Sequence, residues 1–253
     1  MVKCLFCGEN STLKLKIENY KIYFCKKCEI SFLYPLPENI EKIYNKEYFE
    51  NWYLPYYNER KKYFERIYLK LKKFIPENGK LLDIGCGVGI FMEMMKEKKY
   101  EVIGYEISQF AIEFCKKKGL KVFDSLNFSE KTFDIITIMD VIAHVKNPII
   151  YLDEIKKILK KNGILIIKTP LHSNYMFFIS NTFPFTLKSK AILHIPAQIY
   201  HFNKNSILKM AEIKNFKVEK IFIIKEFITR KLSFFNIWKF FVEKSIVAVL
   251  RNE

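Results

Sequence analysis

The sequence predicts an α/β fold: a parallel sheet with helices on both faces, preceded by a small cysteine-rich ribbon. Three observations support this prediction. From Lys80 onward, apolar strands alternate with amphipathic helices, a pattern typical of a parallel sheet with right-handed crossovers. The strand Lys80–Ile84 runs directly into a turn with glycines at positions 85, 87 and 89. Two Cys-x-x-Cys pairs lie within the first 28 residues.

Composition bounds the class of protein. The 253 residues fit one large domain or two unequal ones, and half are hydrophobic, enough for a sizeable core. The net charge of +16 has two interpretations: an anionic partner (RNA, a nucleotide-sugar or a membrane surface) or a lysine-rich solvated surface. The start, Met1-Val2-Lys3-Cys4, does not resemble a secretory signal and no apolar run approaches membrane-spanning length, so we expect a cytoplasmic protein.

Residues 1–36 are expected to form a zinc ribbon. An alternating apolar pattern between the two cysteine pairs favours a hairpin, which would bring the pairs together. Four thiolates suit one tetrahedral Zn²⁺ with no open position, hence a structural metal. Two disulfides are the alternative, which a reducing compartment disfavours. The predicted zinc ligands are Cys4, Cys7, Cys25 and Cys28, and the remaining cysteines, Cys86 and Cys115, are expected to be free thiols.

Residues 37–75 are expected to be a linker and an N-terminal helix, because Pro35-Leu36-Pro37 ends the ribbon. Tyrosines are frequent between Tyr44 and Tyr57, where they are expected either to cover a cofactor or to pack on the helix. Apolar residues at three- and four-residue spacing predict a helix over Asn58–Phe74. The remaining domain is expected to span residues 76–253.

Within that domain the strands and helices are predicted in order. The strands are Lys80–Ile84, Glu101–Tyr105, Leu120–Phe123, Phe133–Met139 and Gly163–Thr169, and the helices between them are Ile90–Lys98, Ser108–Lys118 and Asn147–Lys160. A helix over Ser206–Ile213 and an antiparallel pair, Lys217–Ile224 and Ser245–Leu250, are expected to close the domain. Ligands of such sheets bind at the carboxyl ends of the strands.

The glycine turn discriminates between two cofactors. Its third glycine comes one residue earlier than in the dinucleotide fingerprint. Asp83, two residues before the first glycine, would repel a pyrophosphate but can hold a cationic ammonium group. The pattern D-x-G-x-G-x-G resembles motif I of class I S-adenosylmethionine (SAM) methyltransferases. The resemblance implies a Rossmann-like seven-stranded sheet with SAM as its cofactor.

Further cofactor contacts are expected where the neighbouring strands end. Glu106 follows the strand Glu101–Tyr105, and its carboxylate can accept hydrogen bonds from both ribose hydroxyls. Ile107 would pack on the adenine, and the resemblance places the adenine edge at the end of the next strand. The predicted cofactor-binding residues are Asp83, Gly85, Cys86, Gly87, Gly89, Glu106, Ile107, Asp124, Ser125 and Met139.

The stretch Phe133–Pro148 resembles the fourth-strand motif of the ubiquinone O-methyltransferase-like branch, in which an N-terminal zinc ribbon also recurs. Ala143 stands where that branch usually has glutamate, so no catalytic metal is expected. Asp140 is expected to face the methyl site, where it would bind the acceptor or the SAM amine. His144 is a candidate general base, because the pKa of histidine lies near neutrality.

A later segment, Ala197–Asn203, resembles another motif of the same branch. Gln198 stands where relatives often have histidine, which makes His201 the second candidate base. Either histidine could instead be structural. Residues 171–204 are expected to cover the substrate. Aromatic stretches at 174–195 and 232–241 are expected to be cover packing or a dimer contact, or, for the second, a surface helix at a membrane or a lipid-linked acceptor.

The sequence therefore predicts a SAM-dependent methyltransferase with a small-molecule acceptor: a sugar, quinone-like or lipid-linked hydroxyl or carbon, of which an anionic form would suit the basic charge. One alternative is an RNA methyltransferase whose zinc ribbon holds RNA. Met139-Asp140-Val141-Ile142 differs from the Asn/Asp-Pro-Pro-aromatic motif common in base-amino RNA enzymes of this fold. A second alternative is a SAM-binding scaffold without catalysis. The oligomeric state is left open.

Overall fold

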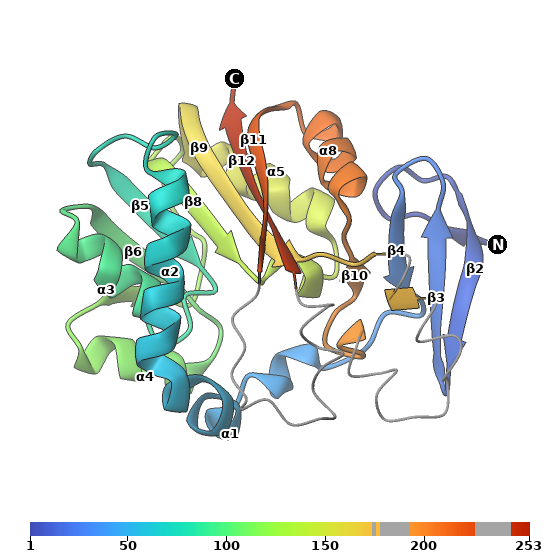
Figure 1. Cartoon of the computed structure of the whole chain (residues 1–253), viewed down its shortest axis with the longest axis horizontal. Helices are drawn as coiled ribbons and strands as arrows, with labels where there is room; N and C mark the ends of the chain where they lie inside the picture. The colour runs from blue at the N-terminus through green and yellow to red at the C-terminus, as the bar shows by residue number, and fades with distance from the viewer. Residues whose placement is uncertain (174–175, 178–192, 226–243) are drawn as a thin grey trace.

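The computed structural model describes residues 1–173, 176–177, 193–225 and 244–253. A seven-stranded sheet with helices on both faces forms the centre of this part of the chain, and a smaller sheet lies at one side of it (Figure 1). The aromatic stretch 232–241 and most of the stretch 174–195 lie outside the described residues, so the roles expected for them stay predictions. The predicted α/β class is confirmed.

The large sheet has the strand order β11-β12-β9-β8-β5-β6-β7. Strands β7, β6, β5, β8 and β9 are parallel, and β12 and β11 are antiparallel to their neighbours. The strands are β5 (Lys80–Ile84), β6 (Glu101–Tyr105), β7 (Lys121–Phe123), β8 (Phe133–Met139), β9 (Leu159–Pro170), β11 (Phe216–Lys225) and β12 (Lys244–Asn252). The helices are α2 (Tyr57–Leu71), α3 (Ile90–Glu97), α4 (Gln109–Lys117), α5 (Pro148–Ile158) and α8 (Lys204–Ile213).

Most predicted boundaries agree with the structure to within three residues, and β5, β6 and β8 agree at both ends. The largest difference lies between α5 and β9. The sequence predicts a helix to Lys160, but the helix ends at Ile158 and β9 begins at Leu159, which pairs with Phe133 of β8. A long-range strand pairing therefore takes two residues that local propensity assigns to the helix.

Alternate residues of the central strands pack on opposite helical layers. Ile135 of β8 packs with α2 and α3, whereas Ile136 and Ile138 pack with α5 and α8. The two-residue period of a strand makes this division, and both faces of the central strands are apolar because both are covered. The covered sheet is the rigid support for the loops at its carboxyl edge.

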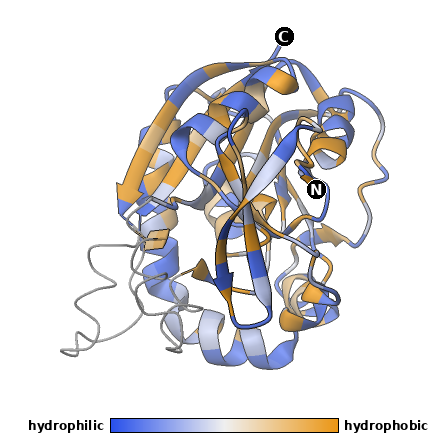
Figure 2. Ribbon diagram, turned by 90° about the vertical axis from the view of Figure 1, so that its right-hand side faces the viewer, coloured by the Kyte–Doolittle hydropathy of each residue, from blue (hydrophilic) through white to orange (hydrophobic). Residues whose placement is uncertain are grey.

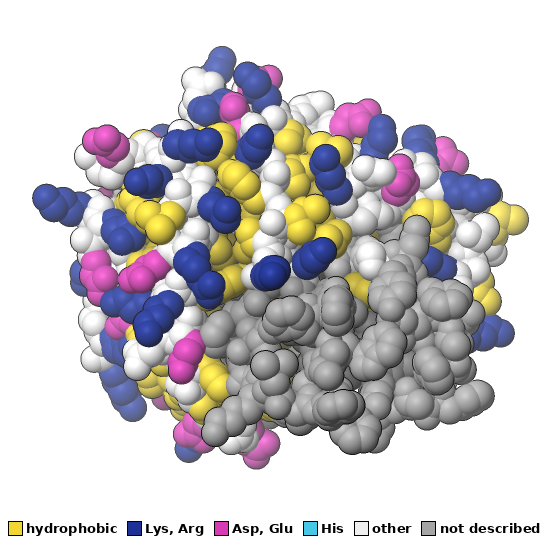
Figure 3. Space-filling model, viewed as in Figure 1, with side chains coloured by type: hydrophobic (Ala, Val, Ile, Leu, Met, Phe, Trp, Pro, Cys, Tyr) yellow, Lys and Arg dark blue, Asp and Glu magenta, His cyan; other side chains and the backbone are white. Residues whose placement is uncertain are grey.

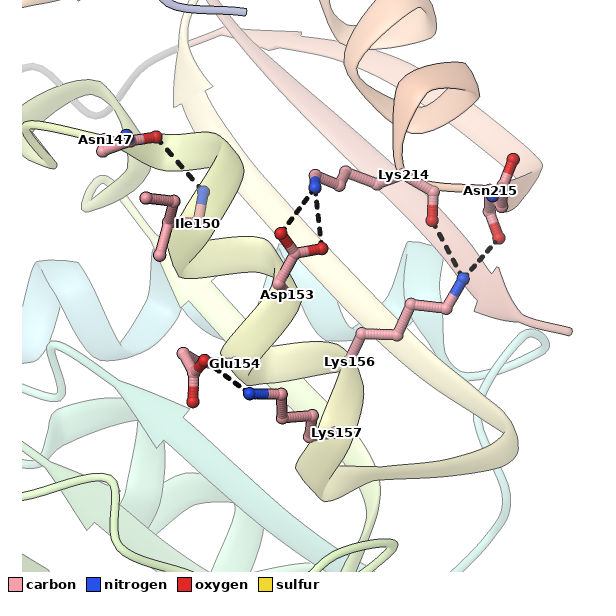
Figure 4. A network of polar contacts seen from close by, with 8 residues as sticks. All are labelled: Asn147, Ile150, Asp153, Glu154, Lys156, Lys157, Lys214 and Asn215. Atoms are coloured by element: carbon pink, nitrogen blue, oxygen red, sulfur yellow. Dashed lines mark hydrogen bonds and ion pairs between the residues drawn. The ribbon is translucent and has the colours of Figure 1, made fainter.

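Polar contacts join helix α5 to the residues that follow helix α8 (Figure 4). The Lys214 ammonium contacts both carboxylate oxygens of Asp153 at 2.7 Å, and Lys156 donates to the carbonyl oxygens of Lys214 and Asn215 at 2.9 Å. These contacts tie α5 to the turn between α8 and β11. Asn147 caps the start of α5 by accepting from the Ile150 N–H.

The small sheet consists of the ribbon and one strand from much later in the chain. Its order is β1 (Val2–Lys3), β2 (Asn10–Ile17), β3 (Tyr20–Cys25), β4 (Ile30–Leu33) and β10 (Tyr200–His201), all antiparallel. Hydrophilic and hydrophobic residues are interleaved along its long strands (Figure 2). Some of the ribbon's buried residues, among them Phe6 and Phe32, belong to the same core cluster as α5 and α8. The others form a separate cluster with residues 176–177, Leu193 and Ile195; they are Leu15, Ile17, Ile22 and Leu33. The domain boundaries at 36 and 75 stay predictions.

Short helical turns connect the ribbon to α2. They are a 3₁₀ turn (Ile40–Ile43), α1 (Lys46–Tyr48), a π-helical turn (Phe49–Tyr53) and a second 3₁₀ turn (Leu54–Tyr56). A further 3₁₀ turn, Ile142–His144, follows β8. Among the described residues, no helix is both long and apolar enough to cross a membrane. On the face seen in Figure 3, lysine and arginine side chains are spread over the described surface with acidic and apolar residues between them.

Candidate active site

Backbone hydrogen bonds tie the glycine turn to the end of β6. The N–H groups of Gly85 and Cys86 donate to the Tyr105 carbonyl at the end of β6, at 2.8 and 3.2 Å. Gly85, Gly87 and Gly89 have φ angles of 70°, 54° and 79°, which glycine adopts without strain. A Cβ on Gly85 would collide with Val141, and one on Gly87 would project to 3.4 Å from Phe49. Gly85 therefore allows Val141 to pack closely on the turn, and Gly87 keeps the space between the turn and Phe49 open for a ligand.

Glu106 joins the glycine turn to the end of β6. Its side chain is buried, Oε2 accepts from the Gly87 N–H at 2.8 Å, and Oε1 accepts from the N–H groups of Ile107 and Ser108 at 2.8 and 2.9 Å. These contacts fix the carboxylate and occupy the third N–H of the turn. Because Oε2 accepts only one of these bonds, it can accept a second from a ribose hydroxyl.

Asp83 adds a second buried carboxylate below the turn. It is 2 % exposed, and Oδ1 accepts from the Thr137 hydroxyl of β8 at 2.6 Å. Burial, with a smaller contribution from the nearby Glu106, raises the pKa of Asp83 to about 7, against the opposing effect of the Thr137 hydroxyl. A cation beside Asp83 would favour its ionised form. This acidic turn, with three of its N–H groups already bonded, suits a cationic amino acid group better than a pyrophosphate.

The other predicted cofactor residues differ in exposure: three are exposed to solvent, and Met139 and Cys86 are buried. Ile107 is 52 % exposed, Asp124 and Ser125 are exposed, and Met139 is buried at the end of β8. Ile107 is therefore open to contact with an adenine ring. Cys86 is buried with its thiol toward Gly104, below the turn, so at most its backbone faces a ligand. None of the six cysteines forms a disulfide, which agrees with the free thiols predicted for Cys86 and Cys115.

An aromatic cover, formed by Tyr44, Tyr48, Phe49 and Tyr53, lies over the glycine turn. Phe49 stacks on Phe110 of α4, with ring centroids 5.9 Å apart. Burial raises the pKa of all three tyrosines, and the nearby Asp140 carboxylate raises each of them further. The hydroxyls therefore stay protonated and can donate hydrogen bonds at the site. The tyrosine-rich composition indicated this cover, but not that Phe49 meets Gly87.

Asp140 follows β8 and is held by a lysine that the sequence analysis missed. The Lys168 ammonium lies 2.6 Å from Asp140 Oδ2, and the Asp140 N–H donates to the Lys168 carbonyl at 2.8 Å. Lys168 is 2 % exposed, whereas the Asp140 side chain is 46 % exposed. Asp140 adopts the left-handed region, with φ of 59°. The sequence feature that could have pointed to Lys168 is that it is the one charged residue within the apolar strand Ile164–Thr169.

His144 lies in the 3₁₀ turn just after Asp140. Its Nδ1 is 2.6 Å from the Ala197 carbonyl oxygen. Because a carbonyl only accepts, we assign the proton to Nδ1, which leaves Nε2 as the acceptor of the neutral ring. Burial lowers the pKa of His144, against the opposing effects of the Ala197 carbonyl, the Asp140 carboxylate and a hydrogen bond to the Asp140 backbone. The ring is neutral at pH 7 and can take up a proton.

His201, the second candidate base, lies elsewhere. It is part of β10, pairs with Ser31 of β4, and is 1 % exposed. Its ring contacts His172 at a centroid distance of 4.7 Å, and its Nε2 lies 3.1 Å from the Leu193 carbonyl. Burial lowers the pKa of His201 to about 4. The structure therefore brings Asp140 and His144 together but places His201 in the contact between the ribbon and the large domain, where a structural role fits its surroundings.

The four ribbon cysteines converge as the spacing predicts. The Sγ atoms of Cys4, Cys7, Cys25 and Cys28 all lie within 4.8 Å of one another, and those of Cys7 and Cys25 are 3.6 Å apart. Tetrahedral zinc with Zn–S bonds of 2.3 Å requires sulfur atoms about 3.8 Å apart. The donor set therefore fits Zn²⁺. It is four sulfurs with no oxygen ligand, which disfavours Mg²⁺ or Ca²⁺.

The strand order and the acidic glycine turn together define a class I SAM-dependent methyltransferase, as the sequence analysis predicted. Comparison with known families agrees, since residues 56–220 match the model of the methyltransferase domain. The chain belongs to this methyltransferase family. Solved structures with the same fold include a putative methyltransferase from Bacillus halodurans (TM-score 0.55, 18 % identity, 73 % of this chain and 97 % of that one). Another is a SAM-dependent methyltransferase from Archaeoglobus fulgidus (0.52, 20 %, 74 % and 94 %).

Curated relatives match part of the chain. The mitochondrial ubiquinone biosynthesis O-methyltransferase of Schizosaccharomyces pombe is 29 % identical over 159 residues, which are 58 % of this chain and 56 % of that protein. The ubiquinone biosynthesis O-methyltransferase of Pelagibacter ubique is 38 % identical over 102 residues, 37 % of this chain and 42 % of that protein. The chain thus spans about half the length of these relatives.

Proposed function

We propose that the protein transfers the methyl group of SAM to a hydroxyl of a small-molecule acceptor. The observation that carries the proposal is His144, a neutral imidazole with Nε2 as its acceptor, four residues after Asp140 at the carboxyl edge of the sheet. A hydroxyl is a better nucleophile when a base removes its proton. The two relatives named as O-methyltransferases support the same chemistry.

The residues divide the work in the following way. SAM, when bound, supplies a methyl group that its sulfonium already activates. Asp83 and Glu106 hold the amino acid and ribose parts, and the aromatic cover excludes water from the turn. Asp140, fixed by Lys168, orients the acceptor or the SAM amine. His144 Nε2 takes the proton of the acceptor hydroxyl, and the Ala197 carbonyl holds the ring while it does so.

The acceptor is proposed to be quinone-like, because the relatives act in ubiquinone biosynthesis by name. Sugars and lipid-linked acceptors, and transfer to carbon, are the other outcomes that one experiment separates. Purified protein is incubated with methyl-labelled SAM and a cell extract, and the labelled product is fractionated by solubility and by chemical class. Label in the methoxy group of a small organic-soluble aromatic ether supports the proposal, whereas label in a C-methyl group would indicate transfer to carbon. Label in RNA would favour the RNA alternative, and no label would favour a scaffold without catalysis.

We further propose that the ribbon binds one structural Zn²⁺ through its four cysteines, supported by the convergence of their Sγ atoms. The metal would hold together a unit too small to have a core of its own. Metal analysis should find one zinc per chain, and Cys4→Ser should lose it. Zinc-free wild-type protein with an intact ribbon would contradict the proposal. Free thiols and a zinc site suit a reducing compartment, so the cytoplasm is the proposed location.

A further inference from the structure

One segment of the chain, residues 197–203, connects the ribbon to the candidate base. On one side this segment contacts the ribbon, and on the other it contacts the turn after β8 (Figure 1). Ile199 makes a backbone hydrogen bond on each side, to Leu33 of the ribbon and to Ala143 of the turn. The segment is therefore placed to transmit the position of the ribbon to His144.

On the ribbon side, the segment completes the small sheet. Tyr200 and His201 pair with Phe32 and Ser31, and the Leu33 N–H donates to the Ile199 carbonyl at 2.9 Å. Aromatic packing adds to the pairing, with the rings of Phe6 and Tyr200 at 5.3 Å.

The ribbon contact ends at Asn203. Its side-chain Nδ2 donates to the Glu29 carbonyl at 2.7 Å, directly after Cys28, the last predicted zinc ligand. Its Oδ1 accepts from the Ser206 N–H and caps α8. Asn203 thus performs two separable tasks with two different atoms.

On the other side, the same segment holds the turn after β8. The Ile199 N–H donates to the Ala143 carbonyl at 2.8 Å, and the Tyr200 hydroxyl donates to the Lys146 carbonyl at 3.0 Å. His144 lies between Ala143 and Lys146 in the turn, and its Nδ1–H donates to the Ala197 carbonyl of the same segment. The orientation and tautomer of His144 therefore depend on a carbonyl whose own position is set from the ribbon.

We propose that the ribbon is a positioning element for the base, with Asn203 as a positioning residue that acts through the Ala197 carbonyl on His144. The proposal deepens the proposed function and depends on it for its kinetic consequences. Because the segment is bonded to both the ribbon and the turn after β8, the Ala197 carbonyl stays in place and keeps the imidazole proton on Nδ1. Nε2 is then available to accept the proton of the acceptor hydroxyl. When the ribbon contact is lost, the carbonyl moves, the ring rotates, and both tautomers become populated.

The test uses an isosteric pair of variants in the full chain. Asn203→Asp keeps an oxygen that caps α8 but replaces the Nδ2 donor by an oxygen facing the Glu29 carbonyl. Aspartate is as good an N-cap as asparagine and is favoured at a helix start, so the helix itself is not weakened. Asn205→Asp is the matched control, because Asn205 donates to the Glu29 carboxylate at 2.8 Å and not to its backbone carbonyl, and the variant makes the same charge change.

Three results are expected for Asn203→Asp and not for Asn205→Asp. The kcat falls about tenfold while the Kd of SAM is unchanged. The acid limb of the kcat profile moves to lower pH, because the Ala197 carbonyl, which raises the pKa of His144, no longer contacts the ring. Nitrogen-15 NMR shows His144 changing from one tautomer to a mixture, and the Ile199 amide exchanges faster.

A second variant guards against misfolding, since Asn203→Ser also caps a helix but cannot reach Glu29, and it should give the same three results. Unchanged kcat and an unchanged His144 tautomer in folded Asn203→Asp or Asn203→Ser would overturn the inference. If wild-type protein transfers no methyl group, the proposed function fails, but the NMR and exchange results still decide whether the ribbon positions His144.

Discussion

The two halves of the candidate site are built in different ways. The centre of the cofactor half comes from one stretch, residues 83–108, in which the neighbouring strands β5 and β6 and the turns after them bond to each other. The acceptor half combines Asp140 and His144 with Lys168 and Ala197. The residues that follow Ala197 are hydrogen-bonded to the ribbon. One half is a local motif, and the other is an assembly of distant segments.

This difference predicts how each half responds to mutation. In the cofactor half, a change acts directly on ligand binding, because the turn itself forms the contact surface. In the acceptor half, a change acts through a neighbour that holds the functional group, so effects on kcat or on acceptor KM should exceed effects on SAM affinity. The four predictions below run from the largest expected effect to the smallest.

The largest effect is expected at Gly87. Gly87→Ala places a methyl group 3.4 Å from Phe49, in the space between the turn and the aromatic cover, and should weaken SAM binding about 100-fold, or ~3 kcal/mol. Gly119→Ala is the matched control: its φ of 70° resembles the 54° of Gly87, but its Cβ would meet no atom within 4 Å. Both variants lose about 1 kcal/mol of stability from the left-handed backbone. Calorimetric titration showing equal SAM affinity in the two variants would contradict this account of the turn.

In the acceptor half, His144→Asn should lower kcat about 100-fold with SAM affinity unchanged. The asparagine amide can still donate to the Ala197 carbonyl, so the backbone contact is preserved while the base is lost. Steady-state kinetics with the acceptor found by product labelling, together with calorimetry for SAM, measure the two quantities. Wild-type kcat in His144→Asn would remove His144 from the mechanism.

The pH dependence of SAM binding tests the buried acid of the cofactor half. The pKa of Asp83 is raised to about 7, and the cationic ammonium of SAM favours its ionised form. SAM affinity should therefore rise about tenfold between pH 5.5 and 7, a range below the pKa of the ligand's own α-amino group. Binding should release a proton, and Asp83→Asn should bind SAM weakly and without this pH dependence. A flat affinity profile in the wild type would show that Asp83 does not pair with the cation.

The smallest effect is expected at Lys168. Replacement of a buried ion-pair partner by an apolar residue of similar shape changes stability little when the partner carboxylate can reach water, as the 46 % exposed Asp140 can. Lys168→Met should therefore fold, keep its SAM affinity and raise the acceptor KM by about threefold to tenfold. Lys160→Met is the control, because Lys160 pairs with Asp134 at 2.8 Å at the opposite end of β8. Equal KM values for the two variants would mean that Lys168 serves only the fold.

The same division explains how much the sequence could predict. Local patterns predict the alternation of strands and helices, the glycine turn and the position of Glu106, because a βαβ unit sets its own geometry. The sequence analysis could not foresee that Cys86 turns inward, since that depends on packing against Gly104. Nor could it foresee that Lys168 reaches Asp140, because pairing of β9 with β8 brings them together.

The histidines show the limit most clearly. His144 and His201 looked equivalent as candidate bases, and only tertiary contacts separate them. His144 is oriented by the Ala197 carbonyl from 53 positions further along the chain, whereas His201 is buried in a strand that pairs with the ribbon. Residues 200–201 form a strand because β4 lies beside them, and no local pattern predicts so short an element.

The central claim is that the acidic glycine turn binds a sulfonium nucleoside and not a pyrophosphate. Calorimetric titration of the purified wild-type protein with SAM and, separately, with NAD tests it most directly. One SAM bound per chain, with no heat from NAD, is the predicted result. Binding of NAD with no binding of SAM would contradict the assignment of Asp83 and Glu106, and with it the proposed chemistry of the acceptor half.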